Sequence, residues 1–240
     1  MDDSDIKGFG AAFRNSDLTM ALGLLTRLPL PYPAYDPAST RPAAHAAWAY
    51  PLAGLVIAVI AALIGGIAQG LGLPPMAQAV IVLLALIVTT GAMHEDGLAD
   101  CADGFWGGWT RERRLEIMKD SQIGSYGVIA LVLSLLLRWY LISELITDEA
   151  LIWALVIAAC GSRSAMVWVM DSLPTARRDG LSDRTGRPGE LATAVAVLIG
   201  VVVIVVAPVV SAWRLVLLGL LAALVVRQIA KRKVGGQTGD

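Results

Sequence analysis

The sequence predicts an all-α protein, a polytopic membrane helical bundle of about six transmembrane helices with an N-terminal interfacial or re-entrant helix. Of its 240 residues, 56% are hydrophobic and only 16% are charged, whereas soluble domains carry about 25% charged residues. The mean hydropathy is +0.67. The apolar residues gather in segments of around 20, about the number that a helix needs to cross a hydrocarbon core of roughly 30 Å. Together these features predict membrane-spanning helices.

The first 49 residues are expected to form a cytosolic or interfacial N-terminal region. Residues 1–15 begin with an acidic, polar run that is not typical of a cleavable signal peptide. Ser16 and Asp17 can cap a helix over residues 18–28, because their side-chain oxygens accept hydrogen bonds from free N–H groups at a helix start. The prolines from Pro29 onward would end this helix. It is too short to span a bilayer, so it is expected at the interface or dipping into the protein.

Residues 50–228 are predicted to form the transmembrane bundle, and residues 229–240 a Gly-rich C-terminal tail. The expected spans cover residues 50–72, 76–93, 124–146, 150–170, 190–209 and 212–228. The sixth is the weakest, because Arg214 and Arg227 bracket only 12 residues. No internal repeat or separate soluble domain is apparent. We therefore expect one integral-membrane domain over residues 1–240.

The positive charges predict the orientation in the membrane. Sixteen of the 19 Lys and Arg residues lie in four alternate segments, namely residues 1–49, the loops 94–123 and 171–189, and the tail. Basic residues favour the cytoplasmic side of a membrane. These four segments are therefore predicted to be cytosolic, and any site in the 94–123 loop is predicted to face the cytosol.

Negative charge is concentrated between His94 and Gly104. Asp96, Asp100 and Asp103 stand at i, i+4 and i+7, which on a helix places them in a stripe roughly 60° wide and about 10 Å long. Carboxylates packed so closely repel one another, and a hard divalent cation such as Mg²⁺ relieves that repulsion. We therefore predict that these three residues bind Mg²⁺ and form the catalytic centre. Glu95 lies off the stripe but close to it.

Two other interpretations of this stripe have to be weighed. The carboxylates would also suit the start of a solvated helix, where the helix dipole favours negative charge. Zinc is the other possibility, since Cys101 and His94 lie in the same stretch. No Cys-x-x-Cys or His-x-x-x-His pairing supports zinc, and Cys101 and Cys160 do not suggest a disulfide framework.

Cations near the stripe suit an anionic substrate. Arg138 and Arg163 lie inside predicted spans, where an arginine costs about 2.5–3.5 kcal/mol to insert. Arg163 has small neighbours, and we expect it to point into a polar cavity that holds an anion. Arg138 would do the same, unless it snorkels to the interface or pairs with Glu144.

The segment 105–123 is predicted to contain a short amphipathic helix, because Leu115, Ile117 and Met118 stand among charged residues. One interpretation of its cations, Arg111 and Lys119 among them, is that they serve only topology and lipid headgroups. Their place just after the carboxylates also suits a polyphosphate substrate, since carboxylates with Mg²⁺ opposite Arg or Lys are the usual parts of phosphoryl transfer.

The motif His-Glu-Asp-Gly-Leu-Ala-Asp-Cys-Ala-Asp-Gly at residues 94–104 resembles the His-x-Asp-Gly-Leu-Ala-Asp-x-x-Asp-Gly signature of the cobalamin (5′-phosphate) synthases, or adenosylcobinamide-GDP ribazoletransferases. The similarity covers nearly the whole chain. Further matches are Thr26–Pro29, Pro51-Leu52-x-Gly54, Leu115–Ser121 with Gly124, Ser162-Arg163, Gly180-Leu181, and Gly235–Asp240. In the family, a further hydrophobic segment follows this last motif, and the 240 residues do not include it.

The resemblance implies a multi-pass enzyme of the bacterial inner membrane with its active site facing the cytoplasm. It would join adenosylcobinamide-GDP to α-ribazole or its 5′-phosphate and release GMP, with Mg²⁺ as cofactor, in the last assembly step of cobalamin biosynthesis. Asp240 would be a further metal ligand. The substrate-binding residues would be His94, Glu95, Arg111, Lys119, Asp120, Ser121, Arg138 and Arg163. The lipid bilayer is the other expected partner, and no nucleic acid is expected.

Three other functions stay open as alternatives. A CDP-alcohol phosphotransferase also uses a carboxylate cluster at the membrane edge, but its pattern needs an arginine where this chain has Asp100. A polyprenyl transferase would show two Asp-rich motifs, and here Asp179 and Asp183 imitate the second only weakly. A divalent-cation transporter would place its carboxylates at mid-bilayer on broken helices.

Overall fold

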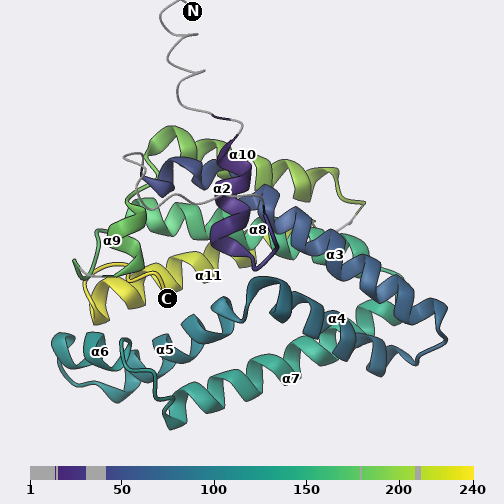
Figure 1. The fold of residues 1–240 in the computed structure, drawn as a ribbon, viewed down its shortest axis with the longest axis horizontal. Coiled ribbons are helices and arrows are strands. Elements are labelled where there is room, and N and C mark those ends of the chain that lie inside the picture. The colour runs from purple at the N-terminus through teal and green to yellow at the C-terminus, as the bar shows by residue number, and fades with distance from the viewer. Residues whose placement is uncertain (1–13, 15, 31–41, 179, 209–211) are drawn as a thin grey trace, which may run out of the picture.

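The computed structural model describes residues 14, 16–30, 42–178, 180–208 and 212–240. Within these ranges the regular structure is helical, with one isolated parallel bridge between Thr175 and Gln237. The all-α prediction is confirmed. Figure 1 shows two groups of helices, with α4, α5, α6 and α7 below and the remaining helices above. Most of the Pro-rich 31–47 stretch lies outside the described residues.

The N-terminal helix α2 (Ser16–Leu25) begins two residues before the predicted helix 18–28 and ends three residues before its predicted end. Asp17 is fully buried, and its Oδ2 accepts hydrogen bonds from the backbone N of Arg14 (3.0 Å) and from Nε1 of Trp48 (2.8 Å). Trp48 belongs to the short 3₁₀ helix η1 (Ala43–Ala49), which continues into α3 (Tyr50–Gly70). Asp17 therefore joins the residue Arg14 before α2 and the 3₁₀ helix before α3 to α2.

The centre of the upper group is the packing of α3 against α8 (Leu151–Ser172). A Cβ at Gly54 would collide with the backbone carbonyl of Ala159, so glycine lets the two helices approach closely. The helix α10 (Glu190–Val206) packs on another side of α8. There Ser164 Oγ donates a hydrogen bond to the carbonyl of Ala196 at 2.8 Å.

The lower group is built on a sharp break between α4 (Pro75–Thr90) and α5 (Met93–Gly107). Their axes are bent by 85°, because Gly91 (φ 65°) and Ala92 (φ 58°) both adopt left-handed conformations that end one helix before the next begins. The long helix α7 (Ser125–Thr147) packs along both of them (Figure 1). The predicted span 76–93 is therefore only the first half of a broken helix.

Four helices in the described residues are long and apolar enough to cross a membrane, or five if α4 and α5 together form one span. They are Ala43–Gly70, α7, α8 and α11 (Ala212–Lys233). The helix α10 is shorter than the predicted span 190–209. It ends at Val206, because Ala207 adopts an extended conformation before Pro208. The membrane bundle is confirmed, with four or five spans by this criterion against the six expected.

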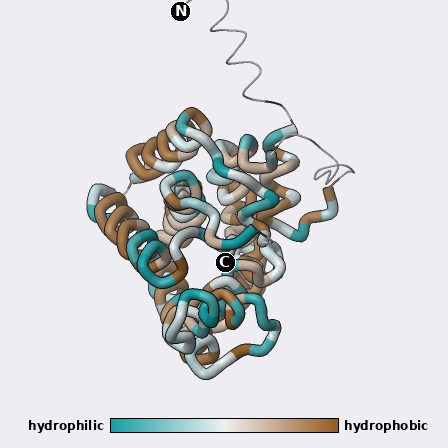
Figure 2. Tube along the Cα trace, turned by 90° about the vertical axis from the view of Figure 1, so that its left-hand side faces the viewer, coloured by the Kyte–Doolittle hydropathy of each residue, from teal (hydrophilic) through white to brown (hydrophobic). Residues whose placement is uncertain are grey.

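Hydrophobic and hydrophilic parts of the chain separate in space. Figure 2 shows hydrophobic helices at the outside and a hydrophilic region around the C-terminal segment. On the outer helices, Leu63, Leu133 and Leu218 are each about 60% exposed, with values of 64%, 62% and 62%. Two short helices, α6 (Arg111–Ile117) and α9 (Leu181–Thr185), lie in the connections near the C-terminal segment (Figure 1). The polar parts of the chain therefore gather at one end of the bundle.

Candidate active site

The segment Gly235–Asp240 is held against the loop that follows α8. The backbone N of Gln237 donates to the carbonyl of Pro174 at 2.9 Å, and the carbonyl of Gln237 accepts from the N of Ala176 at 2.8 Å. A Cβ at Gly236 would collide with the carbonyl of Pro174, so only glycine fits there. Gln237 and Thr238 are buried. This segment, which we call the tail, is a packed part of the fold.

Arginines from α6 fix the base of the tail. Arg111 donates from Nε to the carbonyl of Val234 (2.8 Å) and from Nη2 to the carbonyl of Ala176 (2.6 Å). Arg114 donates from Nη1 to the carbonyl of Lys233 at 3.1 Å. The sequence predicted that Arg111 contacts substrate, but in the structure these donors bind backbone carbonyls. We therefore interpret Arg111 as a residue that holds the tail in place.

The tail brings Asp240 onto the helix that carries the acidic stripe. A Cβ at Gly97 of α5 would lie 3.1 Å from the backbone carbonyl carbon of Asp240. The charge of Asp100 is close enough to those of Asp240 and Asp96 to be repelled by both. Opposite them, Arg177 Nη2 lies 3.8 Å from Oδ2 of Asp240. Three carboxylates, from Asp96, Asp100 and Asp240, are thus gathered beside one guanidinium.

The electrostatics of Asp240 reflect this crowding. Burial raises the pKa of its carboxyl above the ordinary value, and the negative charge of Asp96 raises the pKa further. A hydrogen bond with Thr238 and the charge of Arg177 act in the opposite direction. The net increase means that the ionised form of Asp240 is less stable here than in water. A bound cation would remove that cost.

The third carboxylate of the predicted stripe has a different role. Asp103 is buried, and its two oxygens accept hydrogen bonds from the backbone N of Gly124 (2.7 Å, to Oδ2) and of Gly127 (2.9 Å, to Oδ1). Gly124 is the residue that caps the start of α7. A Cβ at either glycine would clash with the Asp103 carboxylate. The i, i+4, i+7 spacing correctly predicted a helix, but in the structure Asp103 caps α7.

We expect Asp103→Ala to lower the stability of the protein, because it leaves two N–H groups at the start of α7 without their acceptor. Loss of a capping side chain costs roughly 0.5–2 kcal/mol. Thermal unfolding of the detergent-purified protein measures the effect. Asp148→Ala is the matched control, because Asp148 is exposed at the other end of α7. Equal melting temperatures for the two variants would contradict the capping role.

The gathered carboxylates fit the chemistry of Mg²⁺. Their donors are all oxygen, the ligand type that Mg²⁺ prefers, and Mg²⁺ usually takes one or two carboxylates together with water and substrate phosphates. In the described residues, no group of three or more His, Cys, Asp or Glu side chains lies close enough together to hold a metal ion. By their oxygen donors, Asp96, Asp100 and Asp240 are the candidate ligands, and Mg²⁺ stays a prediction.

Next to these carboxylates, α5 contributes two further side chains that contact neighbouring helices. His94 Nε2 lies 2.7 Å from Nη2 of Arg163 on α8. Glu95 Oε1 accepts from Nη1 of Arg138 on α7 at 2.6 Å. The interpretation that Arg138 pairs with Glu144 is wrong, because a separation of six residues places the two on different faces of α7. The predicted residues His94, Glu95, Arg138 and Arg163 are thus brought together.

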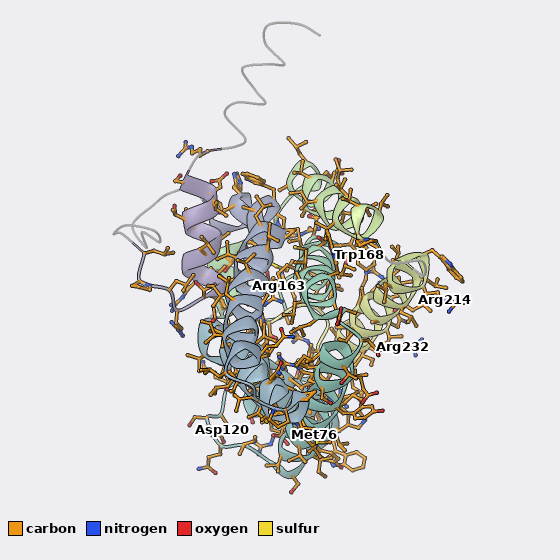
Figure 3. All side chains as sticks on the ribbon, turned by 90° about the vertical axis from the view of Figure 1, so that its right-hand side faces the viewer. Met76, Asp120, Arg163, Trp168, Arg214 and Arg232 are labelled. Carbon is orange, nitrogen blue, oxygen red and sulfur yellow. The ribbon has the colours of Figure 1, made fainter. Side chains whose placement is uncertain are left out.

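The predicted residues that follow α6 lie apart from this group. Lys119, Asp120 and Ser121 are exposed. Figure 3 shows Asp120 at the periphery and Arg163 near the middle of the bundle. Asp120 and Asp103 line a cavity of about 360 Å³ between the C-terminal end of α5 and the start of α7. Tyr126, Ile117 and Ile123 contribute its apolar surface.

The position of Arg177 beside Asp240 was not predicted from the sequence. Arg177 was counted only among the basic residues that set topology, yet it faces Asp240 and also donates from Nη1 to the carbonyl of Leu115 at 3.5 Å. The sequence carried one signal for it, since Arg177 precedes Gly180-Leu181, a pair that matches the family. A pair match alone does not show which neighbouring side chain reaches the site.

Comparisons with known proteins identify the family of the chain. The family model described as cobalamin-5-phosphate synthase matches residues 17–240. The adenosylcobinamide-GDP ribazoletransferase of Bradyrhizobium diazoefficiens is 43% identical over 94% of this chain and 86% of its own length. The proteins of the same name from Mesorhizobium japonicum and Brucella ovis are 43% and 35% identical, each over 93% of this chain and over 85% and 89% of their own lengths. No solved structure matches the chain. By its sequence along almost its whole length, the chain belongs to the cobalamin-5-phosphate synthase family of transferases.

Proposed function

We propose that this transferase moves the adenosylcobinamide phosphate group from adenosylcobinamide-GDP to α-ribazole or its 5′-phosphate and releases GMP. The observation that carries the proposal is the meeting of Asp240 with Asp96 and Asp100 of α5, beside Arg177. An acidic cluster with cations around it matches a diphosphate substrate and a divalent metal. The proposed place is the cytoplasmic face of the bacterial inner membrane, following the distribution of basic residues.

In the proposed reaction a hydroxyl oxygen of the ribose attacks the phosphorus atom of the cobinamide phosphate. A new P–O bond forms, the bond from that phosphorus to the oxygen of GMP breaks, and the hydroxyl proton is lost to a base or to water. Mg²⁺ held by Asp96, Asp100 and Asp240 would neutralise oxygens of the diphosphate. Arg163 would bind the diphosphate from the protein side and hold it in line with the nucleophile.

The acceptor also has a candidate position. The cavity lined by Asp103, Asp120 and Tyr126 adjoins the carboxylates, because Asp103 is one helical turn from Asp100 on α5. Its isoleucines and Tyr126 suit a flat aromatic base, and the Asp120 carboxylate suits sugar hydroxyls. We propose that α-ribazole binds here, so that Asp120 takes part in acceptor binding.

Detergent-purified protein with adenosylcobinamide-GDP, α-ribazole and Mg²⁺ is expected to form the cobalamin product and one GMP per turnover. Chelation of the metal is expected to stop GMP release, because the diphosphate charge is then not neutralised. Chromatographic measurement of GMP and of the corrinoid tests both points. Product formation that continues unchanged with excess chelator would contradict the role of a metal, and absence of GMP would contradict the reaction.

The same experiment separates the proposed reaction from a transport function. The break between α4 and α5 is a feature expected of a cation transporter, which carries its carboxylates on broken helices. A transporter needs no nucleotide-linked substrate, whereas the proposed reaction must release GMP. Membership of a transferase family also favours the proposed reaction.

A further inference from the structure

Four side chains from three helices form a partly buried polar cluster beside the carboxylates. Arg163 of α8 lies against His94 of α5, and Arg138 of α7 is paired with Glu95 of α5. The side chain of Glu95 is only 13% exposed. Arg163 lies near the middle of the bundle (Figure 3). Charged groups that are partly withdrawn from water in this way are stabilised by partners, because water solvates them only in part.

The contact between Arg163 and His94 fixes the protonation of the histidine. A guanidinium has only N–H donors, so Nε2 of His94 must be the acceptor at 2.7 Å. The imidazole is therefore neutral and carries its proton on Nδ1. His94 orients the arginine without cancelling its charge.

The charges of the cluster then leave one cation unbalanced. Glu95 neutralises Arg138, and His94 is neutral, so the net positive charge belongs to Arg163. In the described part of the chain, no carboxylate lies within ion-pair distance of Arg163. Its Nε is also buried without a hydrogen-bond partner among the described residues. A buried guanidinium with an unused donor and no counter-ion is arranged for an anionic ligand.

We propose that His94 is a positioning residue that holds the Arg163 guanidinium where it binds a phosphate of the nucleoside diphosphate in the substrate. This inference rests on the proposed function. It adds that His94 positions Arg163, and that Arg163 rather than Arg138 binds the phosphate. Arg138 is already occupied by Glu95, so Arg163 supplies the charge for the phosphate. His94 acts only through Arg163 and does not touch the phosphate.

The test uses GDP as the probe and the detergent-purified full chain with Mg²⁺. His94→Leu removes the acceptor, and we expect GDP to bind roughly tenfold more weakly, as for the loss of one hydrogen bond to a charged group. His94→Gln offers an amide oxygen to the guanidinium and should recover most of the affinity. Ser164→Ala is the matched control, because it removes another buried interhelical bond of α8, that to the Ala196 carbonyl, and should leave GDP binding unchanged.

A double-mutant cycle separates positioning from general structural support. If His94 acts through Arg163, His94→Leu should have no further effect on GDP affinity in an Arg163→Gln background. Wild-type affinity in His94→Leu, or additive losses in the double variant, would overturn the inference. Because GDP binding needs no acceptor, this result is independent of turnover. A wild-type protein that binds GDP through His94 and Arg163 but releases no GMP from adenosylcobinamide-GDP would overturn the proposed function alone.

Discussion

Asp100→Asn is expected to reduce turnover by roughly 10²–10³-fold or more, as for the loss of a group that stabilises charge in a transition state. The charge of Asp100 is repelled by those of both Asp96 and Asp240. The amide keeps the shape of the side chain but loses the charge that a divalent cation needs. The rate of GMP release measures the effect.

The same variant should behave differently in stability measurements. Without metal, Asp100→Asn removes one of three crowded negative charges, so its melting temperature should equal or exceed that of the wild type. Added Mg²⁺ should raise the melting temperature of the wild type, because a ligand that binds the native state stabilises it, but not that of Asp100→Asn. Glu116→Gln is the control, since Glu116 forms only an exposed ion pair with Arg113. Wild-type turnover in Asp100→Asn would contradict the metal site.

Removing residues 235–240 is expected to abolish turnover while the helices still insert. The deletion takes away Asp240 and also the backbone hydrogen bonds that join Gln237 to Pro174 and Ala176. Arg177 then loses its carboxylate partner. Product formation by the shortened protein, at equal yield of monodisperse material, is the measurement. Turnover equal to that of the full chain would show that the tail takes no part in the site.

Two point variants separate the contributions within the tail. Asp240→Asn removes the charge and leaves the tail in position, so it should lower turnover with little change in melting temperature. Gly236→Ala keeps the charge but prevents the tail from seating, because its Cβ meets the carbonyl of Pro174. It should lower both turnover and stability. Gly219→Ala of α11 is the matched control, since a Cβ there meets nothing within 4 Å.

Much of the fold could be predicted because hydropathy and proline positions are local signals. Helices α3, α7 and α8 begin and end within about two residues of the predicted spans. The end of α10 was overestimated although Pro208 is visible in the sequence, because apolar residues continue to the proline. The break between α4 and α5 was missed, since it depends on a left-handed Ala92, a conformation that alanine rarely adopts.

The candidate site was predicted less completely, because helical spacing places side chains on a face but does not say what that face meets. The stripe placed Asp96, Asp100 and Asp103 together, and α5 is indeed a helix. Only packing shows that Asp103 reaches the start of α7 and that Asp240 approaches Gly97 instead. Likewise, the charge of Arg138 was visible in the sequence, but its partner Glu95 is 43 residues away.

The bridge between Thr175 and Gln237 has a consequence for how the protein matures during synthesis. The ribosome delivers α5 with its aspartates long before the tail, and the apolar helices α7, α8, α10 and α11 are made in between. Because chains fold progressively as they are made, the nascent protein holds an unfinished carboxylate cluster until the tail emerges and seats. The proposed catalytic centre therefore becomes competent only after α11 has been made and the tail has seated on α5.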